Sequence, residues 1–172
     1  MILKAIPSSL VDCPCQNITP ENHHLNGGIP IAISTLTAKQ RKFFSHARHM
    51  AEMSDFHRAP VGCIAVIGNK VVATGFSQQR THPMQQHYNR YRDFDGQKNI
   101  IAKLHAEMVV VSQLKNKSID FSKISIYIYR VCRSRDCGIS RPCGACMMAI
   151  KNIGIKNVFY TTDFGYAHER IA

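Results

Sequence analysis

Two cysteines and a histidine in this sequence have the types and spacing of metal ligands. Cys143 and Cys146 lie three residues apart in SRPCGACMMAI, and His105 precedes Cys143 by 38 positions in LHAEMVVVSQL. Thiolates and imidazoles are zinc ligands, and residues three apart on a helical turn share one face. The two cysteines alone also fit a buried thiol pair or a C-x-x-C redox pair. A redox pair would leave His105 unexplained.

The elements expected around these residues can bring them together. His105 stands at the start of one predicted helix, and Cys143 stands at the start of the next. Helices that connect parallel strands begin at the same edge of a sheet. Pro142 suits a first helical turn, where no N–H is needed, and a helix N-terminus lowers a thiol pKa. We therefore expect one zinc ion on His105, Cys143 and Cys146, with the fourth position left for water.

Glu107 extends the pattern, because it follows the histidine by two positions and can move protons without binding the metal. HAE followed by PCGAC is the H-x-E…P-C-x-x-C signature of zinc deaminases that act on nucleobases. Over about residues 37–165 the sequence resembles the cytidine and deoxycytidylate deaminase superfamily. Its histidine ligand makes it most similar in style to the deoxycytidylate and tRNA adenosine deaminases.

The resemblance implies a mechanism and several substrate contacts. It implies that zinc-activated water attacks C4 of cytosine or C6 of adenine, and that Glu107 protonates the neighbouring ring nitrogen and then the leaving ammonia. It also implies that the backbone N–H of Ala106 holds the carbonyl of a cytosine ring. Ser77 stands where many members have an asparagine that meets the sugar. We add Pro142 beside the cysteines as a further substrate-binding residue.

The elements predicted from the sequence alternate between helices and strands. TAKQ at residues 37–40 is a capping box for a helix that should end near Ser54–Asp55, and Gly68-Asn69 is a hairpin turn. KISIYIYRV and KNVFYTT supply later strands, and Gly154 should end the helix of the cysteine motif. This order predicts an α/β fold, which the resemblance makes a three-layer cytidine-deaminase-like fold.

The predicted sheet is mixed and has four to five strands, with an antiparallel edge hairpin followed by parallel strands, covered by helices. Only about ten residues follow FYTT, which leaves little room for a fifth strand. Residues 1–35 show no sustained period, so we expect an irregular N-terminal extension there. Residues 36–172 are then the zinc-dependent deaminase domain.

The charge of the chain favours anionic partners. The net charge is +11, of which the first 38 residues contribute −1, so the remainder carries +12. A long loop at residues 77–104 interleaves arginines with aromatic residues and could grip phosphates and stack a base, or be a plain solvated loop. We name Arg80 and Tyr88 from it as substrate-binding residues. The other members are Arg90, Arg92, Tyr91 and Phe94, and a second basic cluster holds Arg130, Arg133, Arg135 and Arg141.

Other metal arrangements stay open. The first is a structural zinc on four thiolates, the second a structural zinc on a histidine pair, and the third a site in the CPC stretch. Cys63, in an apolar run, is otherwise expected to be a small core residue. The three sets are Cys132, Cys137, Cys143 and Cys146; His82 and His87 with Cys63 or His57; and Cys13 and Cys15 with His23 and His24.

The sequence shows no sign of a membrane span or an export signal. No window approaches 18 consecutive apolar residues, and the N-terminus lacks the apolar run of a secretory signal. Seven cysteines cannot all pair within one chain. We therefore expect a cytoplasmic protein, with most cysteines present as thiols or metal ligands and with no membrane partner.

Three functions follow, in order of preference. The first is hydrolytic deamination of a cytosine nucleoside or nucleotide, (d)CMP to (d)UMP above all, by an enzyme that uses one Zn²⁺ ion per chain. The second keeps this chemistry but acts on cytosine or adenine in tRNA or single-stranded nucleic acid. The third is a zinc-stabilised nucleic-acid-binding module without catalysis, which would not need Glu107. The resemblance also implies a homo-oligomer.

Overall fold

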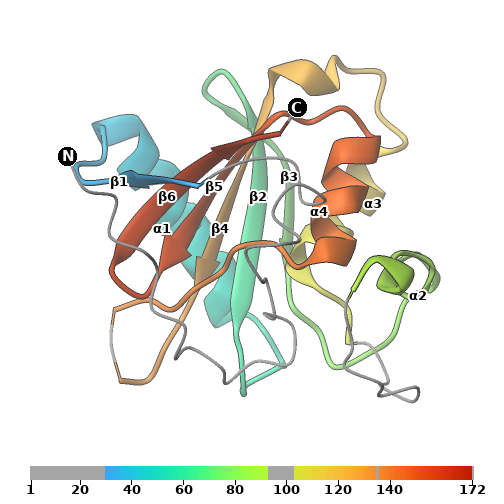
Figure 1. Ribbon diagram of the computed structural model, residues 1–172, viewed down its shortest axis with the longest axis horizontal. Helices are drawn as coiled ribbons and strands as arrows, with labels where there is room; N and C mark the ends of the chain where they lie inside the picture. Colours follow the sequence, from blue (N-terminus) through green and yellow to red (C-terminus); the bar gives the residue numbers. More distant parts are fainter. Residues whose placement is uncertain (1–29, 93–102, 135, 172) are drawn as a thin grey trace.

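A computed structural model describes residues 30–92, 103–134 and 136–171. Its centre is one mixed six-stranded sheet in the order β1-β6-β5-β4-β2-β3 (Figure 1). The strands are β1 (Ile31–Ile33), β2 (Val61–Ile67), β3 (Lys70–Phe76), β4 (Ile124–Arg130), β5 (Asn157–Thr162) and β6 (Gly165–Arg170). The α-helices are α1 (Ala38–Glu52), α2 (Pro83–Tyr88), α3 (Ala106–Leu114) and α4 (Gly144–Asn152), with short 3₁₀ turns η3 (Asn89–Tyr91) and η4 (Phe121–Lys123). Within these described ranges, no helix has the length and apolar character needed to cross a membrane.

The local signals read from the sequence are confirmed. The Thr37 side chain accepts the backbone N–H of Gln40 at 3.2 Å, and the Gln40 side chain accepts the backbone N–H of Thr37 at 2.8 Å. This capping box starts α1, which ends at Glu52, two residues before the predicted end. Gly68 turns between β2 and β3 with a φ of 58°, a conformation that favours glycine.

The directions of the strands bring the two motif helices to one edge of the sheet. β2 is antiparallel to both β3 and β4, so β3 and β4 point the same way, and β4 pairs with β5 in parallel. Since α3 follows β3 and α4 follows β4, both helices begin at the same edge. This confirms the reasoning that placed the histidine and the cysteines together.

The sheet has more strands than the four to five that we predicted. Only Asp163 and Phe164 separate β5 from β6, so the last residues of the chain are enough for one more antiparallel strand. β1 lies inside the segment predicted as an irregular extension and pairs antiparallel with β6. The three residues of β1 are too few to show the alternation of apolar and polar residues that predicts a strand. They form a strand because they pair with β6, which is more than 130 positions away in the sequence.

The two faces of the sheet carry separate cores. Side chains alternate along each strand, so Cys63 and Ile128 face the layer of α3 and α4, whereas Ile64 and Tyr129 face α1. Figure 1 shows α3 and α4 on one side of the sheet and α1 behind it. We call these the α3/α4 face and the α1 face.

A glycine on each face lets a helix approach the sheet closely. A Cβ at Gly62 of β2 would lie 2.1 Å from the carbonyl oxygen of Ala47 in α1. A Cβ at Gly75 of β3 would lie 2.7 Å from the carbonyl oxygen of Ala106 in α3. Because only glycine leaves this space free, Gly75 sets the depth at which the first turn of α3 rests on the sheet.

Candidate metal centre

The three predicted metal ligands converge where α3 and α4 begin. His105 is the N-cap residue of α3, Cys143 is the N-cap residue of α4, and Cys146 lies in the first turn of α4. The Nδ1 atom of His105 is 3.6 Å from Sγ of Cys143 and 3.3 Å from Sγ of Cys146. All three ligand atoms lie within 4.8 Å of one another, and no other such group occurs in the described part of the chain.

The electrostatics of this group favour a thiolate. A hydrogen bond from Cys146 and the charge of His105 hold the pKa of Cys143 well below its ordinary value, against the opposing effect of burial. Burial alone would lower the pKa of His105, but the adjacent Cys143 thiolate outweighs it and raises that pKa. Both cysteines stand at a helix N-terminus, where the backbone dipole also stabilises negative charge.

Glu107 lies beside the ligands without being one of them. It belongs to the first turn of α3 and is buried, and burial raises the pKa of its carboxyl. The charge of His105 is the largest effect that opposes this rise, and a hydrogen bond from Cys146 adds a smaller one. Cys63 is a buried core residue, as predicted, and burial together with the nearby Glu107 charge raises its thiol pKa. A buried carboxyl with a raised pKa is suited to taking up and releasing protons near neutral pH.

Gln85 of α2 holds the backbone of the histidine. Its side chain is fully buried, and its Oε1 atom accepts the backbone N–H of His105 at 3.1 Å. Its Nε2 atom donates to Oδ1 of Asn89 at 3.0 Å, so both ends of the amide are used. Nothing in PMQQHY distinguishes this glutamine from its neighbour, so sequence reasoning missed it.

A buried ion pair anchors the segment that precedes the cysteines. Arg141 donates from Nε and Nη2 to the two carboxylate oxygens of Glu169, both at 2.7 Å. Both side chains are almost completely buried. Because the Arg141 side chain is directed into the protein, this member of the second basic cluster does not offer its charge to an anion at the surface. The pair instead ties β6 to the backbone that leads into Pro142 and Cys143.

The predicted substrate-binding residues occupy different environments. Ala106 is the first residue of α3, where a backbone N–H has no partner within the helix, and Pro142 is buried next to Cys143. Ser77 is buried, and its hydroxyl accepts the backbone N–H that begins β2 at 3.0 Å. Tyr88 is buried and its hydroxyl accepts a side-chain amide of α4 at 3.3 Å, whereas Arg80 is exposed. Their roles toward a substrate remain predictions.

The segment that we predicted as a long loop contains the short helix α2 and the 3₁₀ turn η3, so the prediction of an unbroken loop is wrong. Burial raises the pKa of Cys146 well above its ordinary value, and the charge of Arg92, which follows η3, is only a minor opposing effect there. Phe94, named from the same loop, lies outside the described residues.

The alternative metal arrangements are not assembled. The Cys137 thiol belongs to the core of the α1 face and donates to the carbonyl of Thr162 at 3.4 Å, so the four-thiolate site is wrong. Nδ1 of His82 accepts the backbone N–H of Met84 at 3.1 Å, and Nε2 of His87 lies 3.1 Å from Nη2 of Arg90. No second ligand group forms among the described residues, and the CPC stretch lies outside them.

The donor set fits zinc. One imidazole and two sulfurs are ligands of the softness that zinc accepts, and three protein ligands are the number found in catalytic rather than structural sites. The buried carboxyl beside them is what hydrolytic chemistry at such a site needs. His105, Cys143 and Cys146 would therefore hold one Zn²⁺ ion, as predicted.

Comparisons with known proteins agree with this geometry. The chain resembles the dCMP deaminase of the cyanophage S-TIM5 in complex with dCMP and dUMP, with a TM-score of 0.52 and 17% identity over 74% of this chain and 85% of that one. It also resembles cytidine deaminase from Burkholderia pseudomallei, with a TM-score of 0.50 and 13% identity over 78% of this chain and 93% of that one. No curated protein matched the sequence.

Identities this low show a shared fold alone, so family membership rests on the sequence model. Residues 37–162 match the model of the cytidine and deoxycytidylate deaminase zinc-binding region. That match spans most of the chain and includes the histidine, the glutamate and both cysteines described above. The chain belongs to the cytidine and deoxycytidylate deaminase family of zinc-dependent hydrolases.

Proposed function

We propose that this protein deaminates a cytosine nucleotide, converting (d)CMP and water to (d)UMP and ammonia. The observation that carries the proposal is the convergence of His105, Cys143 and Cys146 on one point, with the buried carboxyl of Glu107 beside them. A non-catalytic zinc module would need the three ligands but not this carboxyl. The buried thiols suit the reducing cytoplasm, which is where we place the reaction.

Each residue has a part in the proposed reaction. Zinc bound by the three ligands would supply hydroxide at neutral pH, because it lowers the pKa of water to about 7. Glu107 takes the proton that the water gives up and delivers it to N3 of the cytosine. It then takes the proton of the new C4 hydroxyl and gives it to the amino group, which leaves as ammonia while the C4 carbonyl of the uracil ring forms. The backbone N–H of Ala106 donates to the carbonyl oxygen of the ring, which fixes C4 near the metal.

The preference for a nucleotide over a nucleoside rests on charge. The charge of Arg92 is one of the smaller effects that lower the pKa of Cys143, and a guanidinium recognises a phosphate well. The fold is also that of a cyanophage dCMP deaminase whose complex holds dCMP and dUMP. We propose that Arg92 meets the substrate phosphate, with Arg80, Ser77, Tyr88 and Pro142 as further contacts around the nucleotide.

A substrate panel tests the function. Zinc-loaded protein is incubated with cytosine and adenine as bases, nucleosides, monophosphates, triphosphates and in a short single strand, and released ammonia is measured. We expect turnover of CMP or dCMP above that of cytidine. The proposal fails if no mononucleotide is turned over and the short strand is.

A second candidate is deamination of a base in tRNA or single-stranded nucleic acid. The observation in its favour is the +12 charge of the chain after residue 38. A strand would be bound by a track of cations, so its affinity would fall steeply with salt, and the slope would decrease by about one per lost contact. A monophosphate needs only one or two cations, so its binding would depend weakly on salt. We also expect a homo-oligomer, which sedimentation of the zinc-loaded protein would test.

A further inference from the structure

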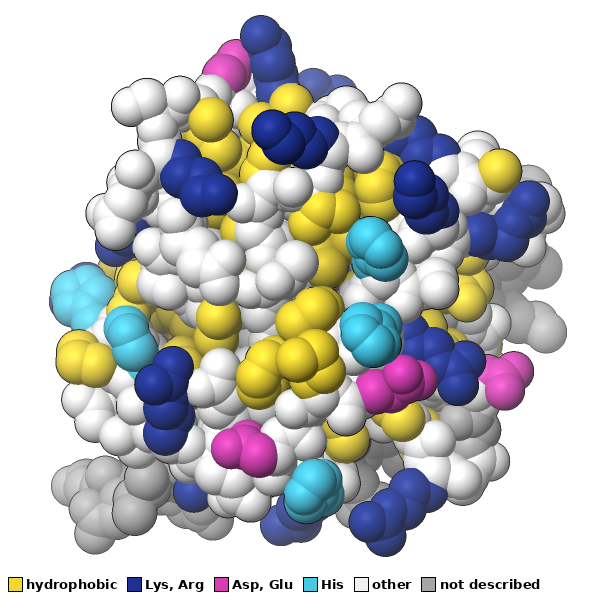
Figure 2. Space-filling view, turned by 180° about the vertical axis from the view of Figure 1, so that it is seen from behind, with side chains coloured by type: hydrophobic (Ala, Val, Ile, Leu, Met, Phe, Trp, Pro, Cys, Tyr) yellow, Lys and Arg dark blue, Asp and Glu magenta, His cyan; other side chains and the backbone are white. Residues whose placement is uncertain are grey.

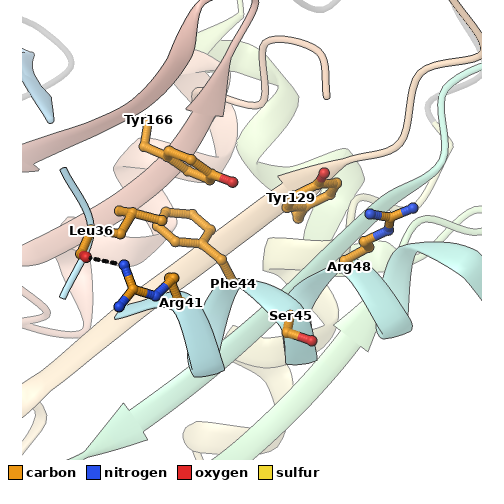
Figure 3. A pocket seen from close by; sticks show the side chains of 7 residues that line it. All are labelled: Leu36, Arg41, Phe44, Ser45, Arg48, Tyr129 and Tyr166. Atoms are coloured by element: carbon orange, nitrogen blue, oxygen red, sulfur yellow. Dashed lines mark hydrogen bonds between the residues drawn. The ribbon is translucent and has the colours of Figure 1, made fainter. Parts of the chain in front are cut away.

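A pocket on the α1 face has no part in the deaminase chemistry. It lies between α1, β4 and β6 and has a cavity volume of about 180 Å³ (Figure 3). Rings form its apolar side, and two arginines and a serine of α1 form its polar side. The lining residues are Leu36, Arg41, Phe44, Ser45, Arg48, Tyr129 and Tyr166.

The sheet separates this pocket from the metal centre. Phe44 and Tyr129 belong to the core of the α1 face, whereas Cys143 and Cys146 belong to the core of the α3/α4 face. A ligand in the pocket therefore cannot reach the metal ligands. A ligand bound in this pocket is therefore a different molecule from the substrate that is bound at the metal centre.

The two arginines stand at opposite ends of the pocket. Arg41 and Arg48 are seven residues apart in one helix, which is two turns and roughly 10 Å along the axis. Figure 3 shows Arg41 at the end near Leu36 and Arg48 at the end near Tyr129, with Phe44 and Ser45 between them. The middle of the pocket is therefore uncharged and each end holds a guanidinium group, that of Arg48 being paired with the carboxylate of Glu52 at 3.1 Å.

Both guanidinium groups keep donors for a ligand. Nη1 of Arg41 donates to the carbonyl oxygen of Leu36 at 2.7 Å, and Nε of Arg48 donates to a carboxylate oxygen of Glu52 at 3.1 Å. Their remaining N–H groups make no hydrogen bond within the described ranges of the chain. Burial raises the pKa of Tyr166, so its hydroxyl stays protonated and can donate as well.

The surroundings of the pocket add to its positive charge. The helix carries four Lys or Arg residues and one carboxylate, Glu52. Figure 2, the view from behind, shows Lys and Arg side chains outnumbering acidic ones on this side of the molecule. An anion approaching the pocket would thus meet a favourable potential.

We propose that this pocket binds a small, elongated ligand that carries a phosphate at each end. A guanidinium fork matches the oxygens of a phosphate, and one fork is present at either end of the cavity. The uncharged linker of such a ligand would lie against Tyr166, which is partly exposed. A nucleic acid strand fits less well, because Phe44 and Tyr129 are buried and do not offer open ring faces for stacking.

The test uses the zinc-loaded full chain with 1,3-propanediol bisphosphate and inorganic phosphate as probes. Affinities are measured by calorimetry, and the site is located by backbone amide shifts. We expect the bisphosphate to bind more tightly than phosphate and to shift amides of α1 and β6. Arg41→Gln and Arg48→Gln should each weaken bisphosphate binding by roughly tenfold, the loss expected for a charge-assisted hydrogen bond.

Lys42→Gln is the matched control, because it removes the same charge from the same helix but does not line the pocket. It should weaken binding by about twofold or less, as expected for a screened, non-contacting charge. Shifts confined to α3 and α4, or equal losses in all three variants, would overturn the proposal. So would preferential binding of a short single strand with a salt slope that falls in each variant, since that describes a nucleic acid surface.

Discussion

The two faces of the sheet handle charge in opposite ways. On the α3/α4 face, ionisable groups are buried and hold one another, as in His105 beside two cysteines and Arg141 on Glu169. On the α1 face, rings fill the core, with Phe43, Phe44 and Phe159 packed around Tyr127, and the charges stay at the surface.

This difference shows how the two faces of one sheet can have different functions. Buried charges are costly unless every partner is in place, so the α3/α4 face must be rigid and its geometry can support chemistry. Surface arginines are solvated and adaptable, so the α1 face can offer a binding pocket without precise geometry. The predictions below test that contrast.

The largest expected effect separates two glutamates that undergo the same change. Glu107→Gln should lower turnover by roughly 10²- to 10⁴-fold, because it removes the proton carrier. Zinc content should stay unchanged, since Glu107 is not in the ligand group. Glu52→Gln, an exposed carboxylate on the α1 face, should keep full activity. Ammonia release measures the turnover of each variant, and elemental analysis measures its zinc content. An active Glu107→Gln protein would refute the mechanism.

The next effect compares one buried ion pair with one exposed ion pair. Glu169→Ala leaves the Arg141 guanidinium buried without its carboxylate and should lower the free energy of unfolding by about 3–5 kcal/mol. Glu52→Ala breaks the exposed pair with Arg48 and should cost about 0–1 kcal/mol. Urea denaturation compares them.

Glu169→Ala should also release zinc faster to a chelator, because Arg141 anchors the backbone before the cysteines. Unchanged zinc release despite lost stability would show that the ion pair supports the fold but not the metal centre.

The two close-packed glycines give a smaller, matched comparison. Gly62→Ala and Gly75→Ala each insert a methyl group against helix backbone and should each cost about 1–3 kcal/mol. Only Gly75→Ala should also weaken zinc retention, because its methyl would press on Ala106, next to His105. Equal zinc retention in the two variants would contradict the claim that Gly75 positions the metal ligand.

The smallest expected effect is a pH dependence on the α1 face. Burial, aided by the charge of Arg170, lowers the pKa of His168, whose ring stacks on Phe159 at 4.2 Å. The folded state therefore binds this proton less readily than the unfolded state, so stability should fall as pH drops below the ordinary value of 6.5.

His168→Phe keeps a ring on Phe159 and removes the titration, so its unfolding free energy should fall less between pH 7.5 and 5. Urea denaturation across that range is the measurement. Identical pH profiles for the two proteins would show that His168 contributes nothing to the dependence.

Much of the fold and the metal centre could be predicted because the signals are local or chemical. The capping box at Thr37, the Gly68 turn and the Gly154 helix stop each depend on a few neighbouring residues. The ligands could be named because few residue types bind zinc and their spacing fits two helix starts. Residue types and their spacing therefore determined the deaminase family of this protein and the group of three residues that could bind a metal ion.

The tertiary structure alone decided what supports that chemistry. β1 forms because β6, more than 130 positions away, supplies its hydrogen bonds, and β6 forms as the hairpin partner of β5, although neither segment shows a clear strand pattern of its own. In the sequence, nothing distinguishes Gln85 from other loop glutamines, and its role appears only because it accepts the backbone N–H of His105 in the structure. In the same way, Arg141 has the sequence context of a surface cation, but in the structure it is paired with Glu169. Residue type decides what a side chain can do, but its partner depends on contacts between residues far apart in the chain, which only folding brings together.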